Sequence, residues 1–167
     1  MSESTPGNAA FTPLGDPHSA LSLQSINLCM MKKLTLEHDV DVIGLTVQLF
    51  PEGIQQAFDS LRRILPEECN RTYFGIVRQD GHGRIEYKAA ASVSGPLENL
   101  PDNLEPMNVK GGVYMAATIK DWRTKLDSIK PTFMRLFQEP GVDHSVPCVE
   151  WYKSDDEMLC MVKIKDK

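Results

Sequence analysis

Positive charge is scarce in this chain relative to negative charge. Its 18 lysines and arginines are outnumbered by 23 aspartates and glutamates, which leaves a formal net charge of -5 at pH 7. Proteins that bind nucleic acids depend on a basic surface that displaces the counterions of the phosphate backbone. The charge balance therefore argues against direct nucleic-acid binding and is more compatible with cationic ligands.

Closely spaced metal ligands are also lacking. The cysteines are scattered without a Cys-x-x-Cys pair, and the histidines of the main body show no ligand-like spacing: Cys29, Cys69, Cys148, Cys160, His38, His82 and His144. Neither a zinc site nor a dense disulfide framework is indicated by such a pattern. The sequence also has no Gly-x-Ser-x-Gly elbow for a nucleophilic serine. We therefore expect neither a metal nor a cofactor.

Long apolar runs do not occur, and the first 29 residues contain no lysine or arginine. A membrane-spanning helix needs about 20 apolar residues, and a secretory signal begins with positive charge. These absences predict a cytoplasmic protein without a membrane partner. Proline, glycine, serine, asparagine and threonine dominate the first 25 residues, which is typical of a flexible segment. The sequence predicts a flexible tail over 1–35 and one domain over 36–167.

Within that domain, one order of elements occurs twice, in residues 42–93 and 109–165. The first half predicts strands over 42–50, 72–77 and 85–93 with a helix over 51–65. The second half predicts strands over 113–119, 146–153 and 158–164 with a helix over 127–138. A repeat of this length is typical of a duplicated unit that buries its apolar face against its twin. We therefore predict an α+β fold.

The predicted architecture has two β-α-β-β units related by a pseudo-twofold axis, an antiparallel sheet, both helices on one face and a central ligand cleft between the halves. Alternation in the first strand points Leu45, Val47 and Leu49 toward the helix. In the second strand of the second half, Glu150 shares a face with Tyr152, while Val149 and Trp151 point to the other face.

Five short motifs carry a resemblance to a known family. They are Gly44-Leu45, Tyr73-Phe74-Gly75-Ile76-Val77, Gly111-Gly112-Val113-Tyr114, Val149-Glu150-Trp151-Tyr152 and Met161-Val162-Lys163-Ile164. In their order and spacing, over about residues 36–165, the chain resembles a stand-alone member of the GyrI-like small-molecule-binding family, to which the effector domains of BmrR and Rob are related. The resemblance implies an aromatic-lined cleft whose base carries an acidic residue that meets lipophilic cations.

The resemblance also assigns candidate site residues. Glu150 matches the acidic residue, and Tyr114 matches a tyrosine that follows the glycine pair. The further candidate ligand-binding residues are Tyr73, Phe74, Tyr87, Trp122 and Tyr152. Aromatic ring faces attract positive charge. The residues taken alone leave alternatives open. Glu150 is either a pocket acid or a solvated strand residue, since glutamate is seldom buried without a partner. The aromatic side chains either line the pocket or belong to the core.

Three functions follow from these observations as alternatives. The first is a protein that binds lipophilic, cationic or aromatic small molecules, for drug or toxin sensing or sequestration. The second is a hydrolase of electrophilic toxins of the cyclopropanoid type, with Glu150 and Tyr114 as catalytic residues, because some stand-alone relatives hydrolyse such compounds. The third is an interaction protein with a partner such as DNA gyrase.

Overall fold

A computed structural model describes residues 31–67, 70–95, 97 and 99–167. The first thirty residues of the expected tail lie outside this set. Residues Lys32–Lys167 form one compact unit, and Met31 is the first residue of its first strand. The expected boundary between tail and domain, after residue 35, falls inside that strand. Neither of the helices in the described part of the chain combines the length and the apolar character needed to cross a membrane.

The described residues form an eight-stranded sheet with two α-helices, so the predicted α+β class is confirmed. The strands are β2 (Met31–Leu36), β3 (Val40–Thr46), β4 (Tyr73–Gln79), β5 (Ile85–Ser92), β6 (Leu104–Val109), β7 (Gly112–Lys120), β8 (Cys148–Tyr152) and β9 (Glu157–Lys163). The helices are α2 (Ile54–Ile64) and α3 (Ile129–Leu136), and two 3₁₀ turns, η2 (Trp122–Thr124) and η3 (Leu126–Ser128), precede α3.

The order of the strands across the sheet is β2-β7-β9-β8-β4-β5-β3-β6. Registered neighbours run antiparallel, including the central pair β4 and β8. The strands of the first expected half, β3, β5 and β4, are therefore neighbours, and those of the second half, β8, β9 and β7, are neighbours too. β4 and β8 join the two sets at the middle of the sheet.

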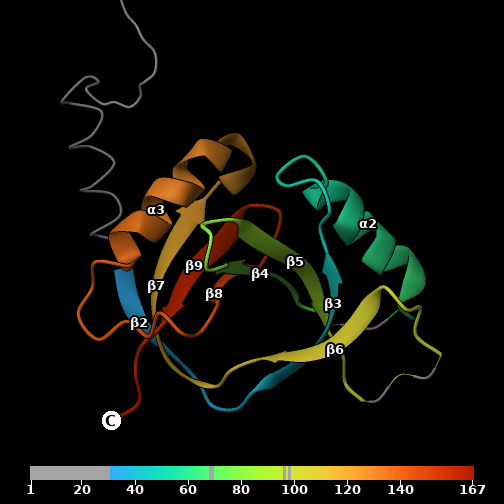
Figure 1. Cartoon of the computed structure of the whole chain (residues 1–167), viewed down its shortest axis with the longest axis horizontal. Coiled ribbons are helices and arrows are strands. Elements are labelled where there is room, and N and C mark those ends of the chain that lie inside the picture. The colour runs from blue at the N-terminus through green and yellow to red at the C-terminus, as the bar shows by residue number, and fades with distance from the viewer. Residues whose placement is uncertain (1–30, 68–69, 96, 98) are drawn as a thin grey trace, which may run out of the picture. The chain divides into compact units, whose positions relative to one another are not determined.

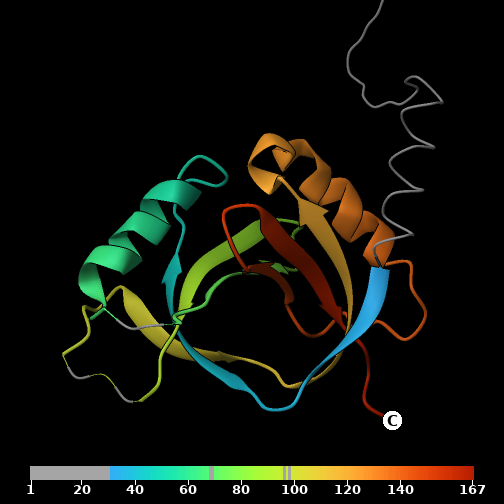
Figure 2. The ribbon, with the colours of Figure 1, turned by 180° about the vertical axis from the view of Figure 1, so that it is seen from behind.

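Each helix covers one flank of the sheet. Helix α2 buries Ala57, Phe58 and Leu61 on one stripe, as the three-four spacing of its apolar residues predicts. It packs on β5 and β3, and α3 packs on β9 and β7. Figures 1 and 2 show both helices on the same side of the sheet, with the central strands between them. The middle of that face is thus left to side chains of the sheet and of the connecting loops.

The first strand is shorter than predicted. β3 ends at Thr46, and the side chain of Leu49, expected to face the helix, is 71% exposed. Pro51 lacks a backbone donor for the strand ladder, so a continued strand is disfavoured here. The chain instead turns, and the N–H of Gly53 donates to the carbonyl of Leu49.

Two strands were not predicted, β2 and β6, and they explain how the sheet curls. Only residues 37–39 separate β2 from β3, and only residues 110–111 separate β6 from β7. Yet β2 pairs with β7 at one edge while β6 pairs with β3 at the other. Both long segments therefore cross from one end of the sheet to the other, which bends it (Figure 2). Where they bend, the N–H of Gly111 donates to Asp39 Oδ1 at 2.8 Å.

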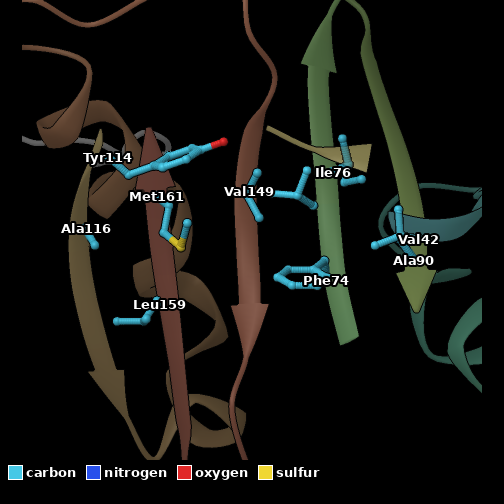
Figure 3. Close-up of a cluster of buried hydrophobic side chains, with 10 residues drawn as sticks. Val42, Phe74, Ile76, Ala90, Tyr114, Ala116, Val149, Leu159 and Met161 are labelled. Atoms are coloured by element: carbon cyan, nitrogen blue, oxygen red, sulfur yellow. The ribbon is translucent and has the colours of Figure 1, made fainter. Parts of the chain in front are cut away.

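The curled sheet encloses an apolar core on the face opposite the helices (Figure 3). This core comprises Val42, Phe74, Ile76, Ala90, Val109, Tyr114, Ala116, Val149, Leu159 and Met161. A second core lies between the sheet and α2, and it comprises Ile43, Val47, Ala57, Phe58, Leu61, Leu65, Tyr87, Ala89, Ala91 and Leu104. The small side chains of Ala89 and Ala91, both fully buried, let α2 approach β5 closely.

The contact between the two bends gives a test of this topology. A Cβ at Gly111 would lie 2.9 Å from the carbonyl carbon of His38 and 3.1 Å from the N of Asp39. Since both are backbone atoms, we expect Gly111→Ala to lower the free energy of unfolding by about 1–3 kcal/mol in urea denaturation, as overpacking does. Gly81→Ala is the control, because no atom lies within 4 Å of its added Cβ. Equal stability of the two variants would contradict the described contact.

Candidate functional site

Glu150 lies at the centre of the sheet and points to the helix side. It stands in β8 between Val149 and Trp151, which belong to the core on the opposite face. Its strand partners are Gly75 in β4 and Cys160 in β9. The residue is only 7% exposed. The pocket interpretation of Glu150 is therefore geometrically possible, whereas the alternative of a solvated strand residue is wrong.

Two tyrosine hydroxyls hold one oxygen of this carboxyl group. Tyr87 Oη donates to Glu150 Oε1 at 2.6 Å, and Tyr152 Oη donates to the same atom at 2.5 Å. The two hydroxyl oxygens lie 3.2 Å apart. Within the described part of the chain, no group donates to Glu150 Oε2 and no basic side chain forms an ion pair with Glu150. The site thus offers one buried carboxylate oxygen to an incoming partner.

Burial shapes the titration of this group. It raises the pKa of the Glu150 carboxyl, and the hydrogen bonds from Tyr152 and Tyr87 oppose that rise in pKa. Burial, with the nearby negative charge of Glu150, also raises the pKa of the Tyr87 hydroxyl well above its usual value and that of Cys148 to about 12. Both groups therefore stay protonated at neutral pH. Among the described residues, Glu150 has hydrogen-bond donors but no ion-pair partner to compensate its ionised form.

Gly75 makes room for this arrangement. A Cβ at this position would lie 2.1 Å from Tyr87 Oη and 2.6 Å from Glu150 Oε1. The tyrosine hydroxyl therefore occupies the space that a side chain on β4 would fill. Gly75 stands in one of the motifs of the family likeness, where the sequence gives it no role, and its position opposite Glu150 in the sheet reveals that role.

An aromatic shell surrounds the two tyrosines. The Tyr152 ring contacts Trp122, with centroids 4.9 Å apart, and Phe58, at 5.4 Å. Phe58 also meets the Tyr73 ring at 6.2 Å, and Phe50 stacks on Tyr87 at 5.5 Å. The structure thus brings four predicted site residues together with Glu150, namely Tyr73, Tyr87, Trp122 and Tyr152.

Phe50 was missed because it lies in a segment predicted to be strand. A signal was present in Pro51, since proline has no backbone N–H for a strand ladder and so favours the end of the strand before it.

Two predicted site residues lie elsewhere. Tyr114 and Phe74 belong to the core enclosed by the curled sheet, on the face opposite Glu150 (Figure 3). The Tyr114 hydroxyl donates to the carbonyl of Lys110 at 2.7 Å, and burial, followed by the negative charge of Asp39, raises its pKa to about 12. The structure therefore does not bring Tyr114 and Glu150 to one substrate, as the hydrolase alternative requires. Among the described residues, no group of His, Cys, Asp and Glu side chains could hold a metal ion.

Comparison with known proteins relates this chain to others by fold. No family model matches the sequence, and no curated protein matches it. Among solved structures, an integron cassette protein from the mobile metagenome of Vibrio cholerae has a TM-score of 0.59 and 15% identity, and the match covers 81% of this chain and 95% of that chain. The protein SAV2435 bound to tetraphenylphosphonium has a TM-score of 0.56 and 10% identity, over 81% and 93% of the two chains.

A regulator is also similar in fold. EcmrR in its complex with DNA has a TM-score of 0.57 and 10% identity, and the match covers 90% of this chain and 63% of that chain. The neighbours therefore include a protein with a bound small molecule and a protein in a complex with DNA. At these identities the likeness concerns the fold.

Gly75→Ala tests the packing under the carboxyl group. Because the added Cβ would overlap the Tyr87 hydroxyl, we expect the variant to lose about 1–3 kcal/mol of unfolding free energy, as in other overpacked sites. In a Tyr87→Leu background the ring is gone, and the same substitution should cost much less. The four proteins form a double-mutant cycle in urea denaturation. Additive losses would contradict the described contact.

Glu150→Gln tests the titration of the buried acid. Its folded-state pKa is raised above the ordinary value of 4.5, so the folded protein retains a proton that the unfolded chain has released. Proton binding by Glu150 makes its full contribution to the free energy of unfolding below pH 4.5. This contribution is lost as the pH rises through the folded-state pKa of Glu150. We therefore expect the stability of Glu150→Gln relative to wild type to increase with pH above 4.5, measured by urea denaturation between pH 4 and 8.

Glu157→Gln is the matched control for that experiment. A hydrogen bond from Lys120 lowers the pKa of Glu157, so its contribution has the opposite sign and is lost as the pH falls. Its stability relative to wild type should therefore decrease, if it changes, as the pH rises from acid to neutral. Parallel pH profiles for wild type and Glu150→Gln would show that Glu150 titrates normally.

Proposed function

We propose that this protein binds lipophilic, cationic small molecules, with Glu150 as the residue that pairs with the positive charge. The observation that carries this proposal is a carboxyl group 7% exposed, with two hydroxyl donors on Oε1 and no basic partner among the described residues. An ionised carboxylate in such surroundings is costly until a positive charge compensates it. A cationic ligand supplies that charge.

The aromatic shell suits the apolar part of such a ligand. The rings of Trp122 and Phe50 contact the rings of Tyr152 and Tyr87, whose hydroxyls donate to Glu150. Ring faces attract a cation by about 0.5–2 kcal/mol, and more strongly when water is excluded. Apolar groups around the charge would also be removed from water on binding. The combination favours a bulky organic cation over a small, strongly hydrated ion.

The structural neighbours support this proposal at the level of the fold. One of them is bound to tetraphenylphosphonium, a lipophilic cation, and another is EcmrR. We infer that the chain is a GyrI-like domain of two duplicated β-α-β-β units related by a pseudo-twofold axis. The strand order supports that inference, because the three strands of one half (β3, β5 and β4) are neighbours, the three of the other half (β7, β9 and β8) are neighbours, and the two sets meet between β4 and β8.

The remaining alternatives have weaker support. The hydrolase alternative assigned catalysis to Glu150 and Tyr114, which lie on opposite faces of the sheet. The alternative of a partner such as DNA gyrase stays a prediction, since no observation bears on it. Ligand binding at Glu150 is therefore the function to test first.

The test compares two ligands that differ in charge. Methyltriphenylphosphonium is a cation, and triphenylphosphine oxide is a neutral molecule of similar shape. In isothermal titration calorimetry, we expect Glu150→Gln to weaken the binding of the cation by about 2–5 kcal/mol. This is the usual loss when one member of a buried charge pair is deleted. The neutral ligand should bind both proteins alike.

Glu157→Gln is again the control, because this half-exposed acid already pairs with Lys120, and it should change neither ligand. Equal losses for both ligands in Glu150→Gln, or no loss for either, would rule out Glu150 as the cation-binding residue.

A further inference from the structure

Two aromatic residues occupy equivalent places in the chain. Phe50 lies in the connection between β3 and α2, and Trp122 lies in the connection between β7 and α3. β3 and β7 are the strands that lead into the two helices. Figure 1 places the beginnings of both helices at the same end of the sheet. Phe50 and Trp122 thus belong to the two connections that lead into the helices at this end.

Each of these rings covers one of the tyrosines that hold Glu150. Phe50 stacks on Tyr87 with centroids 5.5 Å apart and an interplanar angle of 28°. Trp122 meets Tyr152 at 4.9 Å and 61°. Both tyrosine hydroxyls donate to Glu150 Oε1, so each of the two rings contacts a side chain that is hydrogen-bonded to the carboxyl group.

The two rings differ in how they are held. Trp122 Nε1 donates to the carbonyl of Ser154 at 3.0 Å, and the Arg123 guanidinium lies over its ring at 4.5 Å. Phe50 has no hydrogen-bonding group in its side chain and stacks on Tyr87, and it is 42% exposed beside Leu49, which is 71% exposed. Large apolar side chains that gather in the open beside a binding site are typical of surfaces that a ligand covers.

We propose that Phe50 and Trp122 form an aryl clamp, in which both rings contact aromatic groups of the ligand while its positive charge pairs with Glu150. This proposal rests on the proposed function and narrows the ligand class to cations that carry aryl groups. Ring-on-ring contacts contribute beyond the apolar area they bury, so alkyl cations of equal charge gain less. Phe50 is thereby a residue that determines specificity.

The experiment compares two cations of equal charge, tetraphenylphosphonium and tetrabutylphosphonium, by calorimetric titration of the full chain. Phe50→Leu and Trp122→Leu keep an apolar side chain but remove the ring. We expect each variant to bind tetraphenylphosphonium about three- to tenfold more weakly than wild type. Its affinity for tetrabutylphosphonium should stay within about twofold of wild type. Phe137→Leu is the matched control, because Phe137 is 38% exposed and stacks on Phe133 and His144, away from the site. It should change neither affinity.

The outcomes separate the clamp from the proposed function. Equal losses for both cations in Phe50→Leu, no loss for either, or an equal effect of Phe137→Leu would overturn the clamp. If Glu150→Gln still discriminates charge in those cases, the proposed function stands. If wild type binds neither cation, both proposals fail. Thermal melting of each variant, expected within a few degrees of wild type, verifies that a lost affinity reflects the missing ring.

Discussion

The site depends on a carboxyl group that is buried at the middle of the sheet without a positive partner in the described residues. Burial opposes the ionised form of Glu150, while two tyrosine hydroxyls on one oxygen favour it. These opposing effects leave the group poised, because hydrogen bonds alone replace only part of the lost hydration. A positive charge beside the carboxyl group would therefore stabilise its ionised form.

The fold creates this environment by dividing its helices between the flanks. Because α2 packs on β5 and β3, and α3 packs on β9 and β7, neither helix supplies the main cover of the central strands. Phe58 of α2 contacts Tyr152 from one flank, and Phe50 and Trp122, on the connections into the helices, contact Tyr87 and Tyr152. Gly75 lies opposite Glu150 in the sheet, and because it has no side chain, the Tyr87 hydroxyl fits into the space beside it. A rigid sheet thus fixes the acid, and loop residues surround it.

Much of this architecture follows from periodicity. Three-four spacing predicted α2, and alternation correctly separated Glu150 and Tyr152 from Val149 and Trp151. The contact between Tyr87 and Glu150 could not be predicted, because it spans 63 residues and depends on the order of the strands. The position of Tyr114 has a related cause. The family likeness matched it to a site tyrosine, whereas the register of β7 with β9 places it on the face of the sheet opposite Glu150.

The two unexpected strands have a consequence for association between molecules. An open sheet has two edges whose unpaired backbone groups invite another strand to join. Here the edges are β2 and β6, each only six residues long. β2 exposes the adjacent charges of Lys32 and Lys33, and β6 carries the exposed Pro106, which lacks a backbone N–H. Both edges of the sheet therefore resist the addition of a strand from another molecule.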